Sequence, residues 1–192
     1  MSEWVGEGKS GMTQKAFYDW QTAGGGGDVM RLVSVLERLD VPWCVIGGVA
    51  VNQWADEPIV TADVDLVIAL ERVEDVVCAL EAEGFKAERF PWSVNLKGNS
   101  KVSVQISTEE RYRAFPARAV AADVWGILMR VASLDDTLQG KLAAYSDVRR
   151  RPSKRQKDWL DILRMVESHP QLADALPEEL RLKLDAYGEA VK

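Results

Sequence analysis

Two aspartates alternate with apolar residues in a β-branched stretch of the chain, and this pattern restricts the fold more than any other. Asp63 and Asp65 are separated only by a valine within the predicted strand Ala62 to Leu70. Side chains alternate across a strand, so both carboxylates project from one face, with Cα atoms roughly 6.6 Å apart. Val64, Leu66 and Ile68 point to the other face, into a core. Two neighbouring acids on such a strand repel each other unless a cation binds them, and oxygen-rich pairs suit Mg²⁺.

A glycine pair lies between a short apolar run and a helical stretch earlier in the chain. Trp43 to Ile46 is predicted to be a buried strand, and Gly47 and Gly48 follow at once. Glycines at such a junction allow close approach of a backbone, and the N-terminus of the following helix presents amide groups to an anion. Alone, the pair more often marks only a tight turn. Together with Thr61 and the two aspartates, it forms a pattern that indicates a metal and phosphate site.

The predicted elements follow the order helix, strand, helix, strand, helix, then several strands, then helices. This order is typical of an α/β (α+β) protein, with a small mixed sheet flanked by helices and followed by a C-terminal helical region. Gly98-Asn99-Ser100 predicts a hairpin turn, and Ser133 with Asp136 forms a variant capping box. We expect three segments, which are a peripheral N-terminal segment over 1–27, a core over 28–132 and a helical region over 133–192.

The composition excludes several classes of protein. The chain has 192 residues and one histidine, which rules out a His-rich zinc site. Its longest stretch without a formal charge, Val41 to Ala55, is too short to span a membrane, and the N-terminus has no apolar region of a secretory signal. Cys44 and Cys78 lie in apolar runs and are expected to be buried thiols. We therefore expect a cytoplasmic protein that makes no membrane contact.

Positive charge is concentrated in one part of an acidic chain. Residues 141–158 hold seven cationic and two acidic side chains, whereas the formal net charge of the whole chain is −6. Such a stretch suggests a local site for a polyanion, such as the phosphates of a nucleotide or RNA, and a solvated helix start is an equally good explanation. The residues that we assign to RNA are Arg149, Arg150, Arg151, Lys154 and Arg155.

Two groups of motifs resemble a known superfamily. The first group, Ile46-Gly47-Gly48 and Thr61-x-Asp63-x-Asp65-Leu66, is similar to the motifs of polymerase-β-like nucleotidyltransferases. The second group resembles the AbiEii/AbiGii toxin branch and consists of Ser133-Leu134-x-Asp136-x-Leu138-x-x-Lys141-Leu142 and Lys157-Asp158-x-x-Asp161-Ile162. The resemblance covers about Val41 to Glu167. It implies a short mixed sheet that carries the carboxylates and a helical region that closes over the nucleotide.

The resemblance also implies a role for the residues of the first group. Gly47 and Gly48, with Thr61, would bind the triphosphate of an NTP substrate. Asp63 and Asp65 would hold the metal ion, Mg²⁺ or Mn²⁺, and take part in catalysis.

For the second group, the resemblance implies that Lys141 binds the nucleotide and neutralises phosphate charge. Asp158 and Asp161, three residues apart on one helix face, would support catalysis. The third carboxylate that such enzymes usually carry on a neighbouring strand is replaced by Gln105, whose amide oxygen is at best a weak metal ligand. We therefore expect one well-occupied Mg²⁺, with the acceptor activated by Asp158 or Asp161.

Two functions remain open from the sequence. The first is an enzyme that moves a nucleoside monophosphate from an NTP to a hydroxyl of RNA or protein, as the toxin of a toxin–antitoxin pair with an antitoxin protein as partner. The second is a catalytically weak nucleotide-binding or regulatory module that binds a protein partner. Gln105 favours the second function, whereas the intact Asp63, Asp65 and Lys141 favour the enzyme.

Overall fold

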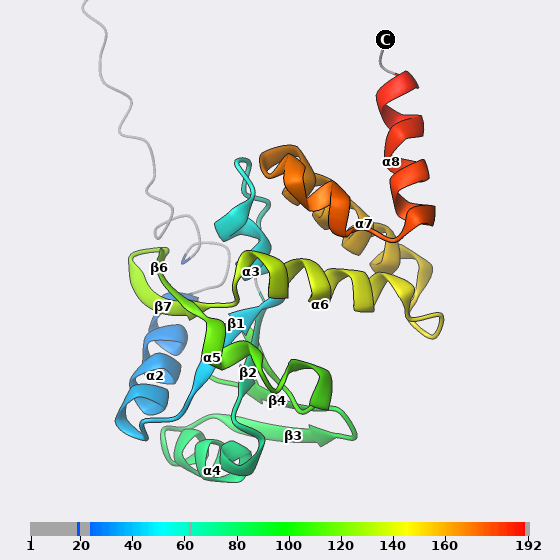
Figure 1. Cartoon of the computed structure of the whole chain (residues 1–192). Coiled ribbons are helices and arrows are strands. Elements are labelled where there is room, and N and C mark those ends of the chain that lie inside the picture. The colour runs from blue at the N-terminus through cyan, green and yellow to red at the C-terminus, as the bar shows by residue number, and fades with distance from the viewer. Residues whose placement is uncertain (1–18, 20–23, 62, 191–192) are drawn as a thin grey trace, which may run out of the picture.

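A seven-stranded mixed sheet forms the centre of the computed structural model, which describes residue 19 and residues 24–61 and 63–190 of the chain (Figure 1). The strand order is β3-β4-β5-β2-β1-β7-β6. The prediction of an α/β (α+β) fold with a mixed sheet is confirmed. The strands are β1 (Trp43–Ile46), β2 (Val64–Ile68), β3 (Lys86–Phe90), β4 (Ser93–Lys97), β5 (Ser103–Ser107), β6 (Val120–Val124) and β7 (Ile127–Val131).

The centre of the sheet contains one antiparallel pair of strands with a parallel neighbour on each side. The first two strands, β1 and β2, are antiparallel, whereas β2 pairs with β5 and β1 pairs with β7 in parallel. The remaining pairs are antiparallel, and they include β6–β7 and the hairpin β4–β5 that Gly98-Asn99-Ser100 predicts. The parallel pairing of β2 with β5 brings together strands that lie on either side of a helix and a hairpin in the sequence.

Helices α2 (Gly25–Arg38) and α4 (Val73–Ala82) contribute to the larger of two apolar cores. The core face of α4 carries Val76, Val77 and Leu80, which are 0% exposed, and the apolar side chains of the strands complete the cluster. Cys78 lies on the outer face of α4 and is exposed, so the prediction of a buried thiol is wrong for Cys78 and confirmed for Cys44.

A second core joins the C-terminal helices to α3 (Gly47–Trp54). Val51 of α3 packs with leucine, methionine and tryptophan side chains of α6 (Leu134–Ser146) and α7 (Pro152–Ser168), and of the segments that follow them. In Figure 1 these helices lie above strands β1 to β5, whereas α2 and α4 lie in the lower part of the view. The remaining elements are η1 (Leu70–Arg72), η2 (Glu110–Tyr112), α5 (Phe115–Arg118), η3 (Pro170–Ala175) and α8 (Glu178–Ala190).

Several boundaries differ from those expected from the sequence. Asp63 lies directly before β2, which begins at Val64, so only Asp65 of the pair belongs to the strand. Helix α2 begins at Gly25 with Gly24 in the left-handed conformation, so the expected boundary between residues 27 and 28 falls inside a helix. Most of the expected peripheral segment, residues 1–18 and 20–23, lies outside the described residues. Among the helices described, none is long and apolar enough to cross a bilayer.

Candidate functional site

The floor of the candidate site is built by three central strands. Asp65 lies opposite Ile46 on β1 and level with Gln105 on the parallel strand β5. Side chains alternate across a strand, so Asp65 and Gln105 share one face while Val64 and Leu66, both 0% exposed, occupy the other. The structure therefore places Gln105 beside Asp65, on the strand where the resemblance implied a third carboxylate.

The glycine pair lies against both ends of segment 61–65, called the aspartate segment below. Gly47 has a φ of 65°, and a Cβ atom on it would overlap the Asp65 carboxylate. A Cβ atom on Gly48 would lie 3.1 Å from Oγ1 of Thr61. The turn from β1 into α3 thus requires glycine for its backbone conformation and for its close approach to Asp65. The amide groups in the first turn of α3 are left without intrahelical partners, as at any helix N-terminus.

Gly47→Ala is expected to reduce stability by about 1–3 kcal/mol, because it adds left-handed strain and a collision with Asp65. The displaced carboxylate should also weaken metal-dependent nucleotide binding. Gly27→Ala is a matched control, since a Cβ atom there meets no atom within 4 Å and alanine favours a helix. Urea unfolding of the two variants checks the expectation, and equal midpoints would contradict it.

The segment before Asp63 is held by Asn52 of α3. The side chain of Asn52 donates from Nδ2 to the Ile59 carbonyl at 2.6 Å and accepts at Oδ1 from the Ile59 amide at 3.0 Å. Oγ1 of Thr61 donates to the carbonyl of Asp63 at 3.4 Å. Asn52 was not among the residues predicted from the sequence, although it lies one helical turn after the glycine pair.

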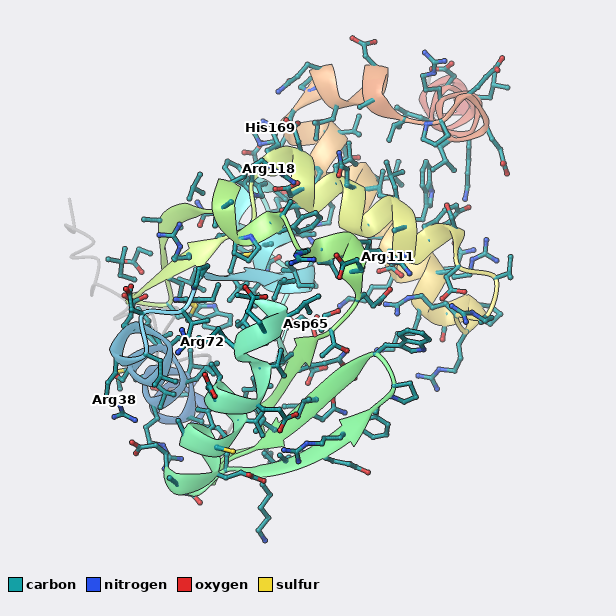
Figure 2. The ribbon with its side chains drawn as sticks, turned by 60° about the horizontal axis from the view of Figure 1, so that its bottom comes forward. Arg38, Asp65, Arg72, Arg111, Arg118 and His169 are labelled. Atoms are coloured by element: carbon teal, nitrogen blue, oxygen red, sulfur yellow. The ribbon has the colours of Figure 1, made fainter. Side chains whose placement is uncertain are left out.

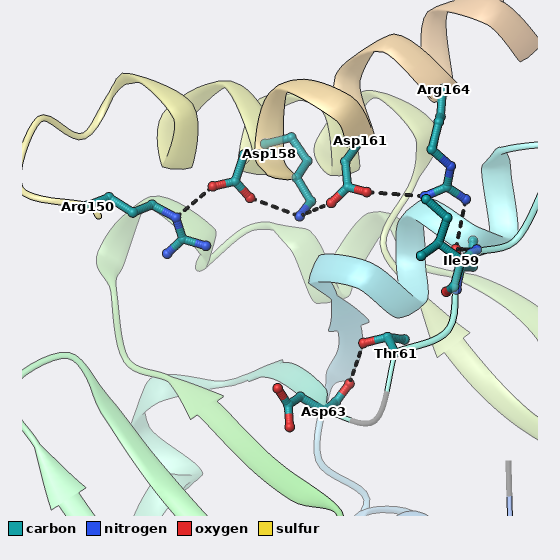
Figure 3. Close-up of polar contacts among 9 residues, drawn as sticks. Ile59, Thr61, Asp63, Arg150, Asp158, Asp161 and Arg164 are labelled. Atoms are coloured by element: carbon teal, nitrogen blue, oxygen red, sulfur yellow. Dashed lines mark hydrogen bonds and ion pairs between the residues drawn. The ribbon is translucent and has the colours of Figure 1, made fainter. Parts of the chain in front are cut away.

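Lys141 of α6 meets Asp158 and Asp161 of α7, and Figure 3 shows the two aspartates side by side on their helix. Nζ of Lys141 lies 3.1 Å from Oδ1 of Asp158 and 2.7 Å from Oδ2 of Asp161. Nε of Arg150 donates to Oδ2 of Asp158 at 2.6 Å. Both aspartates are buried, being 1% and 2% exposed. Each oxygen of Asp158 is therefore engaged by a cation.

A cavity of about 350 Å³ lies between the sheet and the C-terminal helices. It collects Gly47, Gly48, Thr61, Asp63 and Asp65 with Lys141 and Asp158, but Asp161 does not line it. The remaining lining residues, most of them missed by the sequence analysis, are Ile46, Gln105, Ser107, Glu109, Tyr112, Phe115, Asp136, Thr137, Gly140, Ala144, Arg150, Lys154 and Lys157.

The electrostatics of the cavity centre on Asp65. Burial raises the pKa of the Asp65 carboxyl above its ordinary value of 3.8, Lys141 opposes that rise, and the charge of Asp63 adds to it. Burial likewise raises the pKa of Tyr112 on the cavity wall. Burial disfavours the charged form of this carboxylate, and a cation bound beside it would stabilise that form.

The structure divides the basic stretch into two sets. Arg150 and Lys154 line the cavity together with Lys157, which the sequence analysis had not assigned to RNA. Arg149 pairs with Asp147, and Nε of Arg155 donates to the Tyr145 carbonyl at 2.7 Å.

Oxygen donors at the aspartate segment are few. Within the described residues, no group of three or more His, Cys, Asp or Glu side chains is arranged to hold a metal ion. Asp63 and Asp65 remain, with the amide oxygen of Gln105 beside Asp65. This donor set suits one divalent cation whose other ligands come from a bound phosphate or water.

Comparison with protein families identifies a match over most of the chain. A family model described as "Nucleotidyl transferase AbiEii toxin, Type IV TA system" matches residues 34–191. A search of curated proteins found no match.

Comparison with solved structures found similar folds at low sequence identity. The antibiotic-resistance factor ANT(2'')-Ia is 14% identical, with 85% of this chain and 92% of that chain covered and a TM-score of 0.55. JHP933 from Helicobacter pylori is 12% identical, with 93% and 76% covered and a TM-score of 0.54. The lincosamide antibiotic adenylyltransferase LnuA, bound to lincomycin, is 14% identical, with 72% and 96% covered and a TM-score of 0.50. These likenesses show a shared fold.

Proposed function

Because the chain belongs to the AbiEii family of nucleotidyl transferase toxins, we propose that it transfers a nucleoside monophosphate from an NTP to an acceptor hydroxyl, with Mg²⁺ or Mn²⁺ at Asp63 and Asp65. The observation that carries the proposal is that the glycine pair, both aspartates and Lys141 line one cavity. In the reaction, the acceptor oxygen bonds to the α-phosphorus, the bond from that phosphorus to the bridging oxygen breaks, and pyrophosphate leaves.

The residues at the aspartate segment fit a divalent cation. Asp63 and Asp65 offer hard oxygen ligands, and the raised pKa of Asp65 marks a carboxylate that a cation would stabilise in its charged form. Bound Mg²⁺ would neutralise phosphate charge and polarise the α-phosphate. Gln105 adds an amide oxygen without charge, which supports one strongly held ion rather than two.

The chain's own groups bind and orient the triphosphate. The free amides at the start of α3, next to Gly47 and Gly48, are placed to accept phosphate oxygens. Lys141 lines the same cavity and supplies a positive charge. When a phosphate attracts Lys141, Oδ1 of Asp158 loses its ion-pair partner. Asp158 then takes the proton of the acceptor hydroxyl at Oδ1. Its position on the cavity wall supports this role.

RNA is the acceptor that the charges of the cavity rim favour. Arg150, Lys154 and Lys157 line the cavity from the loop before α7 and from α7 itself. Arg150 is paired with Asp158, whereas no ion pair is recorded for Lys154 or Lys157 among the described residues. Two such lysines beside a nucleotide site are suited to the phosphates of an RNA strand. A protein hydroxyl is the alternative acceptor.

Neutralising the two rim lysines is expected to weaken RNA binding. In the double variant Lys154→Gln/Lys157→Gln, the slope of log affinity against log salt should fall by roughly 1–2, the contribution of two lost phosphate contacts. Arg38→Gln/Arg72→Gln removes the same charge from α2 and the turn before α4, where these arginines pair with Glu83 and Asp75 (Figure 2). Fluorescence anisotropy measures both slopes. Equal slopes in the two double variants would show that the lysines are solvated and do not contact RNA.

One experiment tests the reaction and its acceptor together. Purified protein is incubated with each of the four α-labelled NTPs, Mg²⁺ and either total RNA or total protein, with Asp63→Asn as the control. We expect label in RNA with the wild-type protein and none with the variant. Label in the protein fraction would show that the acceptor is a protein hydroxyl. The position of Gln105 beside Asp65 favours the second function, a catalytically weak module, and nucleotide binding without label in either fraction would establish it.

The toxin role has a separate test in cells. Induced expression of the wild-type chain is expected to arrest growth, because RNA molecules that receive the added nucleotide would no longer function. Asp63→Asn, expressed to the same level, should leave growth unchanged. A cognate antitoxin protein is the partner expected to restore growth.

A further inference from the structure

A continuous set of polar contacts lies behind the cavity wall and begins at Asp161. Oδ2 of Asp161 is 2.7 Å from Nζ of Lys141, and Oδ1 accepts from Nη1 of Arg164 at 3.2 Å. Asp161 is 2% exposed and does not line the cavity, in contrast to Asp158 one helical turn earlier. A substrate in the cavity therefore faces Asp158, while both oxygens of Asp161 face cations of the protein.

Arg164 continues these contacts toward the segment that precedes Asp63. Its Nη2 donates to Oδ1 of Asn52 at 2.9 Å and also to the carbonyl of Glu57. Arg164 is 8% exposed, and its partners on α3 and the following segment lie more than a hundred residues away in the sequence. Figure 3 shows the guanidinium between Asp161 and the Ile59 segment.

Residues 57–61 form no helix or strand, so side-chain contacts must fix their course. Asn52 binds both backbone groups of Ile59, and its Oδ1 is shared by the Ile59 amide and Arg164. Two residues later, Thr61 packs against Gly48 and donates to the carbonyl of Asp63. The place of Asp63 thus depends on a segment that Arg164 and Asn52 hold from behind.

We propose that Asp161 and Arg164 are positioning residues, which hold segment 57–61 so that Asp63 and Thr61 face the cavity, and that Asp161 takes no proton from the acceptor. Asp161 orients Arg164, and Arg164 reaches two partners on the segment side because its guanidinium presents several donors in a fixed plane. That Asp63 is thereby placed to bind a metal–nucleotide complex rests on the proposed function. The contacts of Arg164 with Asp161, Asn52 and Glu57 do not depend on catalysis.

The test compares Arg164→Met, Arg164→Lys and Asp161→Asn with Arg72→Met. Arg72 is a matched control, because it also pairs with an aspartate three residues away and donates to a backbone carbonyl, that of Leu39. It precedes α4, beyond the opposite end of β2 from Asp63. The first readout is hydrogen exchange of the Ile59 amide, and the second is the affinity for Mn²⁺-ATP, a triphosphate probe followed by electron paramagnetic resonance.

In Arg164→Met we expect Ile59 exchange to rise at least tenfold and Mn²⁺-ATP affinity to fall roughly 10–100-fold, as when partners of metal-binding groups are removed. Arg164→Lys keeps the charge beside Asp161 but has one ammonium for several partners, so it should restore part of both losses. Asp161→Asn should show the same two effects more weakly, and Arg72→Met neither. If Arg164→Met does not fold, Arg164→Lys against wild type carries the same comparison.

Two results would overturn the inference. One is Ile59 exchange that is unchanged in Arg164→Met and Arg164→Lys. The other is Asp161→Asn that retains wild-type exchange and Mn²⁺-ATP affinity yet transfers no nucleotide, which would make Asp161 a catalytic residue. If the wild-type protein binds none of the four Mn²⁺-NTPs, the proposed function fails, and Ile59 exchange alone decides whether Asp161 and Arg164 hold the segment.

Discussion

Asp65→Asn is expected to reduce nucleotidyl transfer severely while it makes the folded protein more stable at neutral pH. Asp65 is a strand residue whose carboxylate lines the cavity beside Gly47 and level with Gln105. Replacing it with an amide leaves Asp63 as the one charged oxygen ligand on this segment. We expect kcat/KM to fall by on the order of 10³-fold, the several kcal/mol that a bound metal supplies to a phosphoryl transition state.

The gain in stability follows from the raised pKa of Asp65. Burial is the main cause of the rise above 3.8, so between 3.8 and the raised value the folded state binds more protons than the unfolded state. Wild-type stability therefore falls as pH rises through this window, because the folded state must give up a proton that burial favours. Asparagine has no such penalty, so the difference in unfolding free energy between variant and wild type should widen from acid to neutral pH.

Asp63→Asn is the control that separates the two effects. Asp63 is exposed and precedes the strand, so its change should leave the free energy of unfolding nearly unaltered. By calorimetry, Asp63→Asn should weaken Mg²⁺-dependent NTP binding at least tenfold, since a paired carboxylate ligand is lost. Urea unfolding across the pH range measures the stability of both variants. An Asp65→Asn protein less stable than wild type at neutral pH would refute the electrostatic account.

Lys141→Met is expected to lower the free energy of unfolding by about 3 kcal/mol and to remove transfer activity. The ammonium of Lys141 lies within 3.1 Å of Asp158 and 2.7 Å of Asp161, both buried. Removing one partner of a buried ion pair costs about 3–5 kcal/mol, because the remaining charge is left in a poorly solvated place. The lower figure applies here, since each aspartate keeps an arginine, Arg150 or Arg164.

A double-mutant cycle tests the origin of this loss. In Lys141→Met/Asp161→Asn, one of the two carboxylates that lost Lys141 is also removed, so the loss in the double variant should be smaller than the sum of the two single losses. The expected coupling is about 1–3 kcal/mol, as for residues in one ion-pair network. Urea unfolding gives the four free energies of the cycle. Strict additivity would mean that Lys141 contributes by its packed methylene groups instead of its charge.

The elements whose signals are local were predictable from the sequence. The apolar run Trp43 to Ile46 followed by two glycines predicts a strand and then a helix, and the structure has β1 and α3 there. Ser133 caps α6 as its spacing to Asp136 predicted, with Oγ accepting from the Asp136 amide at 3.2 Å. Such signals are local because a cap or a turn is completed within a few residues.

The exposure of single residues was less predictable, because it depends on what packs against an element. Cys78 stands among apolar neighbours in the sequence, yet it lies on the outer face of α4. Asp158 and Asp161 are equivalent by helical spacing, but the cavity reaches only the first of them. The basic stretch looked uniform in the sequence, but Arg149 forms an ion pair with Asp147, whereas Lys154 and Lys157 line the cavity.

By itself, the sequence determined the residue types of the candidate site: a glycine pair, two alternating carboxylates, and a lysine and two aspartates on helices. Only the tertiary structure decided which of them meet. The parallel pairing of β2 with β5 sets Gln105 beside Asp65, and Arg164 reaches Asn52 across 112 residues. Neither contact has a local signal, since strand partners and the docking of α7 on α3 are chosen by the packing of the whole core, where burial of apolar surface outweighs any one short-range preference.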